Sequence, residues 1–384
     1  KNSKVKMSYS YDYSPLERVI WNKDHIEGIL DEVERQGAER IFIVASRTLS
    51  TKTEEIIKLR KALGKKFVGL FDSCKEHSPL ENILECAQKA KESQTDLIVT
   101  IGGGTPIDTV KIVQLCITKN ISTPVELLSM VGRTYRDPSF IRQIAVPTTL
   151  SGGEYSSIAG GTDTNKQLKV RFSGYDLCPK TIILDPKLSL HTPEWLWLST
   201  AIRSVDHAIE GFCSTSNNPL IPLNTMHSLK LFSKCLRETK KDPRNLEARL
   251  MAQQAVWITC KNLGSVPMGA SHGIGYLLGT IGAVPHGLTS CVMLPAVLKW
   301  NEGYLGQKQQ IISDALEDPG STASQAVTNL LKDLGLPITL SEVGIKKGQW
   351  DQIAKYGKNH PVVQTNPRPI NSHSDILEIL ELAS

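Results

Sequence analysis

The sequence predicts an α/β domain followed by an all-helical domain. Up to about residue 185, short β-branched runs alternate with amphipathic helical stretches, a pattern typical of a mostly parallel sheet with crossover helices. After Asp185 and Pro186 the strand-like runs stop and only helical patterns continue. A chain of 384 residues is long enough for two domains of roughly 100–200 residues each. We therefore expect domains at residues 1–186 and 187–384, with a ligand in the cleft between them.

Each element of the first domain follows from its local pattern. The predicted strands, rich in Val, Ile and Phe, are residues 18–21, 40–45, 67–72, 96–101, 143–147 and 180–184. Apolar residues recur at helical spacing in residues 26–36, 53–62, 80–91 and 107–115, each long enough to cross the sheet and return. In the second domain, turn signals such as Asn218-Pro219 and Leu336-Pro337 separate helical patterns.

The composition narrows the class of protein. Hydrophobic residues make up 40% of the chain and charged residues 22%, which is typical of a soluble globular protein. The 44 Lys and Arg against 39 Asp and Glu include no basic run, which argues against a nucleic-acid partner. Eight cysteines without a CxxC pair favour a reducing compartment. Because no apolar stretch reaches the roughly 18 residues of a membrane span, we expect a cytoplasmic protein with no membrane partner.

A glycine-rich loop follows the predicted strand at residues 96–101. It reads Gly102-Gly103-Gly104-Thr105-Pro106-Ile107-Asp108 and leads into a helix. Glycines let the backbone approach a pyrophosphate closely, Thr105 can cap the helix, and Pro106 suits its first turn. A helix N-terminus also favours negative charge. The loop is not the GxGxxG fingerprint, so a tight turn without a ligand is an alternative to a phosphate cradle.

Three histidines of the helical domain predict a shared site. Arg203 and His207 are four residues apart and share one helix face. His272 and Tyr276 have the same spacing, and His286 follows in a glycine-rich segment. Separate core or capping histidines are the alternative, but their grouping favours one site.

Several motifs give the chain a specific resemblance to a known family. They are the loop 102–108, Val146-Pro147-Thr148-Thr149, Asp206-His207-Ala208-Ile209-Glu210, Ser271-His272-Gly273, and Val284-Pro285-His286-Gly287-Leu288 with Leu294-Pro295 after it. Over essentially its full length the chain resembles the iron-containing alcohol dehydrogenase superfamily. Within it the chain is most similar to the maleylacetate reductase branch, also in its closing segment 366–370. The resemblance implies a dehydroquinate synthase-like architecture, with a dinucleotide-binding first domain and hydride transfer between a nicotinamide cofactor and a carbonyl or alcohol compound.

The resemblance also implies which residues bind the cofactor. Gly102, Gly103, Gly104 and Thr105 would hold the pyrophosphate, with Asp108 beside them. Other positions match residues that line the cofactor in relatives, namely His77, Thr148, Thr149, Lys169 and Leu188. Read without the family, the two threonines could equally be a strand-end cap.

The residues after the second predicted strand bear on the choice between NAD and NADP. NAD-specific relatives carry an acidic residue there, which engages the ribose hydroxyls and repels a 2′-phosphate, whereas this chain has Ser46 and Arg47. An uncharged Ser46 beside a cation could accept the phosphate of NADP, so both cofactors stay open. The alternative is that Arg47 is a solvated loop residue.

The ligand set of the metal-dependent relatives is broken in this chain. Those relatives hold the dication with one Asp and three His, and the three His correspond to His207, His272 and His286. Arg203 stands where the resemblance places the Asp. A guanidinium beside a dication is unfavourable in a desolvated site, and we expect the side chain of Asp206 to leave the helix in another direction. We therefore expect no metal, with a metal retained by the three histidines as the alternative.

A metal-free site needs other groups for the same chemistry. Arg203 would polarise the reacting carbonyl oxygen or bind a substrate carboxylate. One of the three histidines, or the hydroxyl of Tyr276, would deliver the proton that balances hydride addition. Tyr276 is itself a departure, since many relatives carry histidine there. The alternative for Arg203 is an ion pair with Asp206 or Glu210 that does not face the cleft.

The sequence thus predicts an NAD- or NADP-dependent reductase, independent of metal, that acts on a small oxo or enone acid or a related carbonyl compound. Three alternatives stay open: a metal-dependent alcohol dehydrogenase with an altered ligand set, a dehydroquinate synthase-like lyase, and a remodelled member with non-redox chemistry or ligand binding in the cleft. The intact glycine loop argues against the last. The family implies a homodimer with a small-molecule substrate.

Overall fold

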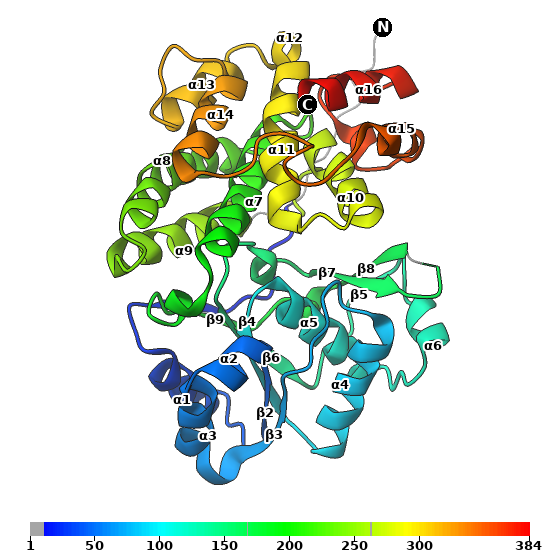
Figure 1. Cartoon of the computed structure of the whole chain (residues 1–384). Helices are drawn as coiled ribbons and strands as arrows, with labels where there is room; N and C mark the ends of the chain where they lie inside the picture. The colour runs from blue at the N-terminus through cyan, green and yellow to red at the C-terminus, as the bar shows by residue number, and fades with distance from the viewer. Residues whose placement is uncertain (1–10, 167, 262) are drawn as a thin grey trace, which may run out of the picture.

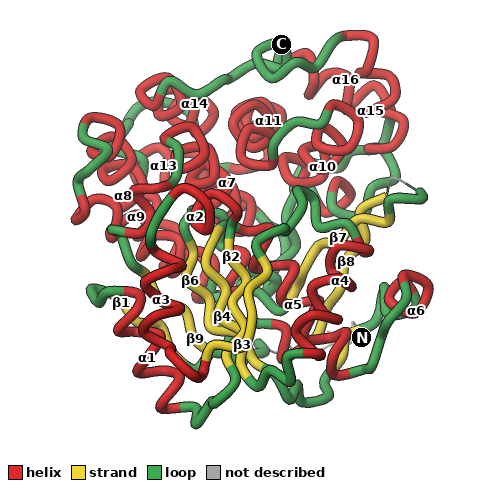
Figure 2. The backbone as a smooth tube through the Cα atoms, turned by 60° about the horizontal axis from the view of Figure 1, so that its bottom comes forward, coloured by secondary structure: helices red, strands yellow, loops and turns green. Residues whose placement is uncertain are grey.

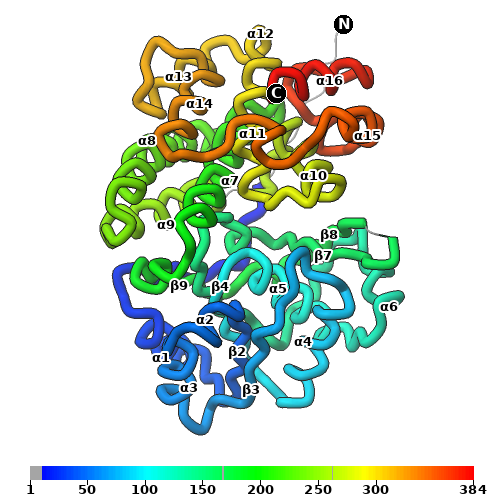
Figure 3. The backbone as a smooth tube through the Cα atoms, in the orientation of Figure 1, coloured from blue at the N-terminus to red at the C-terminus, as the bar shows by residue number. Residues whose placement is uncertain are grey.

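The computed structural model describes residues 11–166, 168–261 and 263–384. A strand-containing half, formed by the earlier part of the chain, lies against a helical half formed by the later part (Figure 1). The tube in Figure 3 shows that the chain leaves the sheet at β9 and enters the helical half through α7. Among the described residues, no helix combines the length and apolarity needed to cross a membrane.

The first half is built on one parallel sheet of six strands. The strands are β1 (Arg18–Trp21), β2 (Ile41–Ala45), β3 (Phe67–Phe71), β4 (Leu97–Gly102), β6 (Arg142–Pro147) and β9 (Thr181–Leu184). Their order across the sheet is β1-β9-β6-β4-β2-β3, and every neighbouring pair is parallel. The predicted parallel sheet is confirmed, and each predicted strand agrees with the structure to within one residue at either end.

Helices cover both faces of this sheet, as Figure 2 shows. They are α1 (His25–Arg35), α3 (Glu55–Leu63), α4 (Leu80–Glu92) and α5 (Gly104–Thr118). Strand β2 explains the two layers, because its side chains alternate between faces. Ile41 and Ile43 join the apolar cluster of α1 and α3, whereas Phe42 and Val44 join that of α4 and α5. A strand buried on both faces reads as a continuous apolar run, which is why the sequence pattern located it well.

A second, small sheet was not predicted. It consists of β5 (Thr134–Tyr135), β7 (Ile158–Asp163) and β8 (Leu168–Gly174), with β8 antiparallel to β7 and parallel to β5. Two glycines interrupt β7, and β8 is only partly buried, so neither gives a strong strand pattern. The short helices α2 (Arg47–Lys52) and α6 (Pro124–Leu128) were missed as well.

The second half is helical, as predicted. Its helices are α7 (Glu194–Cys213), α8 (Leu220–Lys241), α9 (Leu246–Cys260), α10 (Ala270–Gly282), α11 (His286–Trp300), α12 (Glu302–Leu305), α13 (Lys308–Ala315), α14 (Ala323–Leu334), α15 (Trp350–Gly357) and α16 (His373–Leu382). None of the residues described after Leu184 forms a strand. Helix α7 packs against α8, α9, α10 and α11, so it carries its side chains into the middle of this half.

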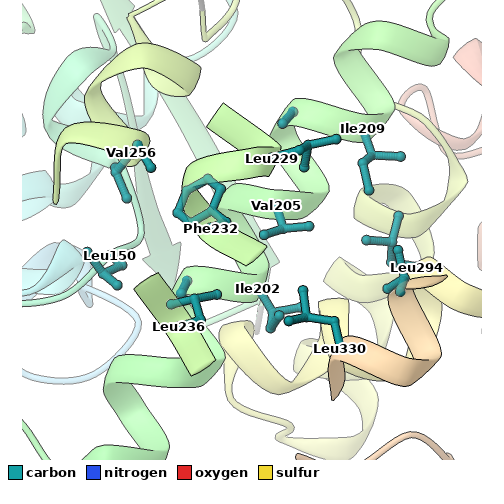
Figure 4. Packing of buried hydrophobic residues seen from close by; sticks show 14 of the residues in the cluster. Leu150, Ile202, Val205, Ile209, Leu229, Phe232, Leu236, Val256, Leu294 and Leu330 are labelled. Carbon is teal, nitrogen blue, oxygen red and sulfur yellow. The ribbon is translucent and has the colours of Figure 1, made fainter. Parts of the chain in front are cut away.

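One apolar cluster joins the two halves. Leu150, which follows β6, belongs to the same buried cluster as Ile202 and Val205 of α7 and Val256 of α9. Figure 4 shows these side chains together with their neighbours on α8, α11 and α14. Residues of β6 and β9 enter the cluster as well. The boundary between the halves is therefore a packed apolar interface in this region.

Candidate active site

The glycine loop lies where the carboxyl ends of the central strands meet. The amide of Ser46, after β2, donates to the carbonyl of Ile101 over 2.9 Å, and the amide of Thr148, after β6, donates to the carbonyl of Gly102 over 2.9 Å. From β2 the chain continues to β3 on one side, whereas from β4 it continues to β6 on the other. This is a topological switch point, where open α/β sheets bind ligands.

The loop is packed so tightly that it requires glycine. A Cβ atom on Gly103 would lie 2.9 Å from Cγ2 of Thr149, and one on Gly102 would lie 2.7 Å from Cγ of Pro106. Gly104 would make only ordinary contacts, so the start of α5 is less crowded. Helix α5 begins at Gly104 with Gly103 as its N-cap. The prediction that Thr105 caps this helix is therefore wrong, because Thr105 already lies in its first turn.

Asp108 links α5 to the small sheet by a hydrogen bond with β7. Its Oδ2 accepts from the amide of Gly160 at 3.2 Å, and its Oδ1 lies 3.2 Å from Nζ of Lys111. The ammonium of Lys111, whose side chain is fully buried, also donates to the carbonyls of Gly153 and Ile158. Protein groups thus already engage both oxygens of Asp108, which favours a positioning role for this residue behind the glycine loop.

The other residues expected at the cofactor occupy the same edge of the sheet. Ser46 is the N-cap of α2, and its Oγ accepts from the amide of Leu49 at 3.4 Å. Arg47 is exposed beside it. Thr148, Thr149 and Leu188 are buried.

Two carboxylates of α7 hold His272 in a buried network. Nδ1 of His272 donates to Oε2 of Glu210 at 2.7 Å and lies 3.4 Å from Oδ2 of Asp206. Oδ2 of Asp206 also accepts from the hydroxyls of Ser271 and Ser290 at 2.8 and 2.7 Å. The expectation that the Asp206 side chain leaves in another direction is wrong with respect to His272, because the helix α10 that carries this histidine packs over that face of α7.

Glu210 has a second task at the start of α10. Its two oxygens accept from the amides of Gly269, Ser271 and His272 at 2.8, 2.8 and 3.2 Å. These are the N–H groups that a helix leaves without partners inside the helix. Gly269, the N-cap residue, has no side chain that could accept hydrogen bonds from these N–H groups. Glu210 therefore caps the start of α10 and also orients His272.

The network continues from His272 to His207. Nε2 of His272 lies 2.7 Å from Nδ1 of His207, a hydrogen bond between the two rings. Burial and Arg203 act to lower the pKa of His272, but the carboxylates of Asp206 and Glu210 outweigh them and raise it above its usual value. Burial, together with the charges of His272 and Arg203, lowers the pKa of His207 well below its usual value. The proton of the pair is therefore held on His272.

Arg203 occupies the centre of the site. Its Nη1 donates to Oγ of Ser290 at 3.0 Å and lies 3.9 Å from Oδ2 of Asp206. Its guanidinium carbon lies 5.5 Å from the ring centre of Tyr276. The ion pair between Arg203 and Asp206, given above as the alternative for Arg203, is thus present, but its two atoms lie far apart for an ion pair. The only side-chain hydrogen bond that Nη1 makes within the described residues goes to a neutral hydroxyl.

A second group of residues gathers at His286. Nζ of Lys169, from β8, contacts Nε2 of His286. The ring centre of His77 lies 6.0 Å from that of His286, and the ring centre of Tyr276 lies 6.3 Å from that of His286. Burial and the nearby Arg203 lower the pKa of Lys169 to about 8. Lys169 and His77, expected at the cofactor, therefore lie in contact with the predicted catalytic residues.

This arrangement does not fit a dication held by the three histidines. Nε2 of His272 is hydrogen-bonded to His207, and Nε2 of His286 contacts an ammonium group. Ligand atoms of Asp206, Glu210 and His272 lie within 4.8 Å of one another. Of this set, however, only Oδ1 of Asp206 lacks a hydrogen-bond partner in the described part of the chain.

Sequence reasoning missed the part played by Glu210, Ser271 and Ser290. A signal for Glu210 was present, because Asp206 and Glu210 are four residues apart and must share one face of α7. The two serines carry no such signal, since they come from α10 and α11. Only the packing of three helices brings them onto Asp206.

The chain is similar to known proteins over most of its length. The sequence model described as iron-containing alcohol dehydrogenase matches residues 16–186, and the one described as the C-terminal part of the Fe-containing alcohol dehydrogenase family matches residues 198–384. Dehydrogenase FUM7 of Gibberella moniliformis is 34% identical, with 91% of each chain covered. Maleylacetate reductase of Pseudomonas sp. strain P51 is 26% identical, with 95% of each chain covered. A solved structure of sulfoacetaldehyde reductase from Bifidobacterium kashiwanohense in complex with NAD+ shares the fold, with a TM-score of 0.87, 22% identity, and coverage of 98% of this chain and 100% of that one.

Proposed function

Because the chain belongs to the iron-containing alcohol dehydrogenase family and is an oxidoreductase, we propose that it is a nicotinamide-dependent reductase that works without a metal. Its substrate is a small oxo or enone acid, or a related carbonyl compound. The observation that carries this proposal is Arg203, a buried cation beside Asp206 and Ser290 where the relatives' metal ligand would stand.

The glycine loop supports the nicotinamide cofactor. Backbone packed too closely for a side chain at Gly103, followed by the N-terminus of α5, suits a pyrophosphate. The NAD+ complex of the related fold points to the same class of ligand. Ser46 and the exposed Arg47 lie at the end of β2, where the adenosine ribose binds in such folds. An acidic residue is missing there, so the proposal includes NADP as well as NAD.

The charges of the site support an anionic substrate. Arg203 and Lys169 both lower the pKa of His286, after burial, which is the largest cause. Two cations in a partly desolvated site favour a carboxylate, and a guanidinium binds it with two parallel hydrogen bonds. Maleylacetate reductases, named for an oxo acid, are among the relatives. The two cations of the site and the name of these relatives thus both support an oxo acid as the substrate of this chain.

The histidine pair offers a route for the proton. A bound nicotinamide supplies the hydride. His207 gives the proton of its Nε2 to the substrate, and at the same time takes a proton at Nδ1 from Nε2 of His272, 2.7 Å away. His272, which starts with protons on both nitrogens, is then neutral, and its Nδ1 proton is still donated to Glu210. One proton thus leaves the pair for each hydride transferred, and solvent restores it. Arg203 stabilises the negative charge that develops on the substrate oxygen.

One assay tests the proposal. Purified protein is analysed for iron and zinc, and oxidation of NADH and NADPH is followed against maleylacetate, other small oxo acids and aldehydes, with and without a chelator. We expect turnover that resists the chelator. We also expect Arg203→Ala to reduce kcat/KM by about 100-fold or more, the effect of removing one donor to a developing oxyanion.

Arg244→Ala provides the matched control, because Arg244 is an exposed arginine of the loop before α9. It should keep the wild-type kcat/KM. Stoichiometric iron or zinc with turnover abolished by chelator would support a metal-dependent dehydrogenase and contradict our proposal. Binding of NADH without any turnover over the whole panel would favour the remodelled, non-redox alternative.

A further inference from the structure

A serine of α11 bridges two opposite charges of α7. Arg203 and Asp206 are three residues apart on this helix, a spacing at which opposite charges are neighbours and attract each other. Nη1 of Arg203 nevertheless lies 3.9 Å from Oδ2 of Asp206, too far for a hydrogen bond. Nη1 donates instead to Oγ of Ser290 over 3.0 Å, and the hydroxyl of Ser290 donates to Oδ2 over 2.7 Å. The two charges thus meet through a neutral group.

Ser290 reaches this position because of its place on α11. It follows His286 by four residues, so both side chains lie on one face of the helix. Ser290 and Asp206 are completely buried, and Arg203 is only 8% exposed. A hydroxyl has one proton to donate and lone pairs that accept. Ser290 uses both abilities on the charged pair of α7.

The carboxylate of Asp206 has donors other than Arg203. Its Oδ2 also accepts from the hydroxyl of Ser271 at 2.8 Å and lies 3.4 Å from Nδ1 of His272. Its Oδ1 is buried and has no hydrogen-bond partner among the described residues. Asp206 can therefore accept a further donor, and the guanidinium of Arg203 lies close enough to become one if its bond to Ser290 is removed.

Neutral groups hold the guanidinium of Arg203. Within the part of the chain that the structure describes, its only side-chain hydrogen bond goes to Ser290. Its guanidinium carbon lies 5.5 Å from the ring centre of Tyr276, within the range of a cation–π contact. A hydroxyl and an aromatic ring orient the guanidinium but do not neutralise its charge. The remaining N–H groups can then form the two parallel hydrogen bonds that a carboxylate accepts.

We propose that Ser290 is a positioning residue that keeps Arg203 from pairing directly with Asp206 and so keeps it available to the substrate. Opposite charges in direct contact attract strongly in a buried site. A direct pair would also occupy the N–H groups that a substrate carboxylate or a developing oxyanion needs. This inference rests on the proposed function, in which Arg203 acts on the substrate.

Crystal structures of the wild type and of Ser290→Ala test the position of Arg203. In Ser290→Ala we expect an Nη atom of Arg203 within about 3.2 Å of a carboxylate oxygen of Asp206, and in the wild type the bridge through Ser290. Ser271→Ala is the matched variant, because it removes another hydroxyl from the same oxygen of Asp206 and leaves Ser290 in place. Arg203 should not move in Ser271→Ala.

A double-mutant cycle tests whether Ser290 acts through Arg203. We expect Ser290→Ala to lower kcat/KM for the best oxo acid about tenfold or more, the effect of losing a hydrogen bond to a charged group. The loss should come mainly from a higher KM for the oxo acid, with little change in the KM for NADH or NADPH. In the Arg203→Ala background the same substitution should change kcat/KM by less than about twofold, because the group that Ser290 positions is absent.

Ser228→Ala is the control for loss of a buried hydroxyl. Ser228 is a buried serine of α8 whose hydroxyl donates to the carbonyl of Thr225 in the same helix, and the variant should keep the wild-type kcat/KM. Far-UV circular dichroism checks that each variant is folded.

Two results would overturn the proposal. One is a guanidinium that does not approach Asp206 in the crystal structure of Ser290→Ala. The other is an equal loss of kcat/KM in the wild-type and Arg203→Ala backgrounds, which would assign Ser290 a purely structural role. Absence of turnover by the wild type would contradict the proposed function, and the crystal structures would still decide whether Ser290 holds Arg203 away from Asp206.

Discussion

At the residue scale, the chemistry of the candidate active site depends on which nitrogen of each histidine has no hydrogen-bond partner. His272 uses both, one towards Glu210 and the other towards His207. His286 uses Nε2 towards Lys169, and its buried Nδ1 has no hydrogen-bond partner among the described residues. The three imidazoles thus differ in role although all three lie on helices of the same half, α7, α10 and α11. The carboxylates and the ammonium group beside them set this difference.

Lys169 leads to a prediction about pH. Its pKa, lowered to about 8 by burial and by Arg203, makes it charged below that pH and neutral above it, whereas an ordinary lysine stays charged to about 10.4. If the charge of Lys169 binds the substrate anion, kcat/KM falls as the pH rises through about 8. Lys169→Arg should remove this fall, because a guanidinium keeps its charge over the whole range.

Lys166→Arg is the matched control, since Lys166 lies on the exposed turn before β8. It should keep the wild-type pH profile of kcat/KM. A Lys169→Arg variant that loses activity above pH 8 in the same way as the wild type would show that another group titrates.

At the scale of elements, close helix contacts set the position of the histidines. Helix α11 carries His286 at its start, and the next residue, Gly287, touches α7. A Cβ atom on Gly287 would lie 2.8 Å from the backbone carbon of Ser199. No rotamer change can relieve a clash with backbone, so the helices would have to move apart.

Gly287→Ala should therefore destabilise the protein by about 1–3 kcal/mol through overpacking. It should also lower kcat, because the shift moves His286. Urea unfolding and steady-state kinetics measure the two effects. Gly303→Ala in α12 is the control: a Cβ atom there meets nothing within 4 Å, and alanine favours a helix. Equal stability of the two variants would contradict this account of the α7–α11 contact.

The sequence predicted well those elements in which the order of apolar and polar residues directly reflects which side chains are buried. Strand β4 is buried throughout because both of its faces are covered, and it is apolar except for Thr100, so its position agrees with prediction. Strand β7 contains two adjacent glycines, so its pairing with β8 and not its composition makes it a strand. The same limit applied to Asp206, because helical spacing gives the direction of a side chain but not the identity of the helix that packs over it.

At the scale of the whole molecule, the two halves share a core. Leu150 and residues of β6 and β9 belong to the same apolar cluster as α7, α8 and α9. A shared cluster favours joint unfolding, because separating the halves would expose this surface to water. We expect circular dichroism and tryptophan fluorescence to report one coincident transition in urea.

Leu150→Ala should shift that transition as a unit. Leu150 is 1% exposed, and deletion of a buried leucine side chain costs about 2–5 kcal/mol. Leu223→Ala, at a leucine that is 64% exposed, should change the stability by less than about 0.5 kcal/mol. Two separate transitions, with only one of them moved by Leu150→Ala, would mean that the halves unfold independently.

The sequence by itself determined the parallel sheet, the helical second half, the glycine loop after β4 and the family to which the chain belongs. It could do so because periodicity, turn residues and short motifs are local properties of the chain. Only the tertiary structure decided that Glu210 and Asp206 hold His272, that Lys169 meets His286, and that Ser290 bridges Arg203 and Asp206. These contacts join residues far apart in the sequence. Such contacts depend on which helices and strands pack together, and the residue pattern within one element does not determine that packing.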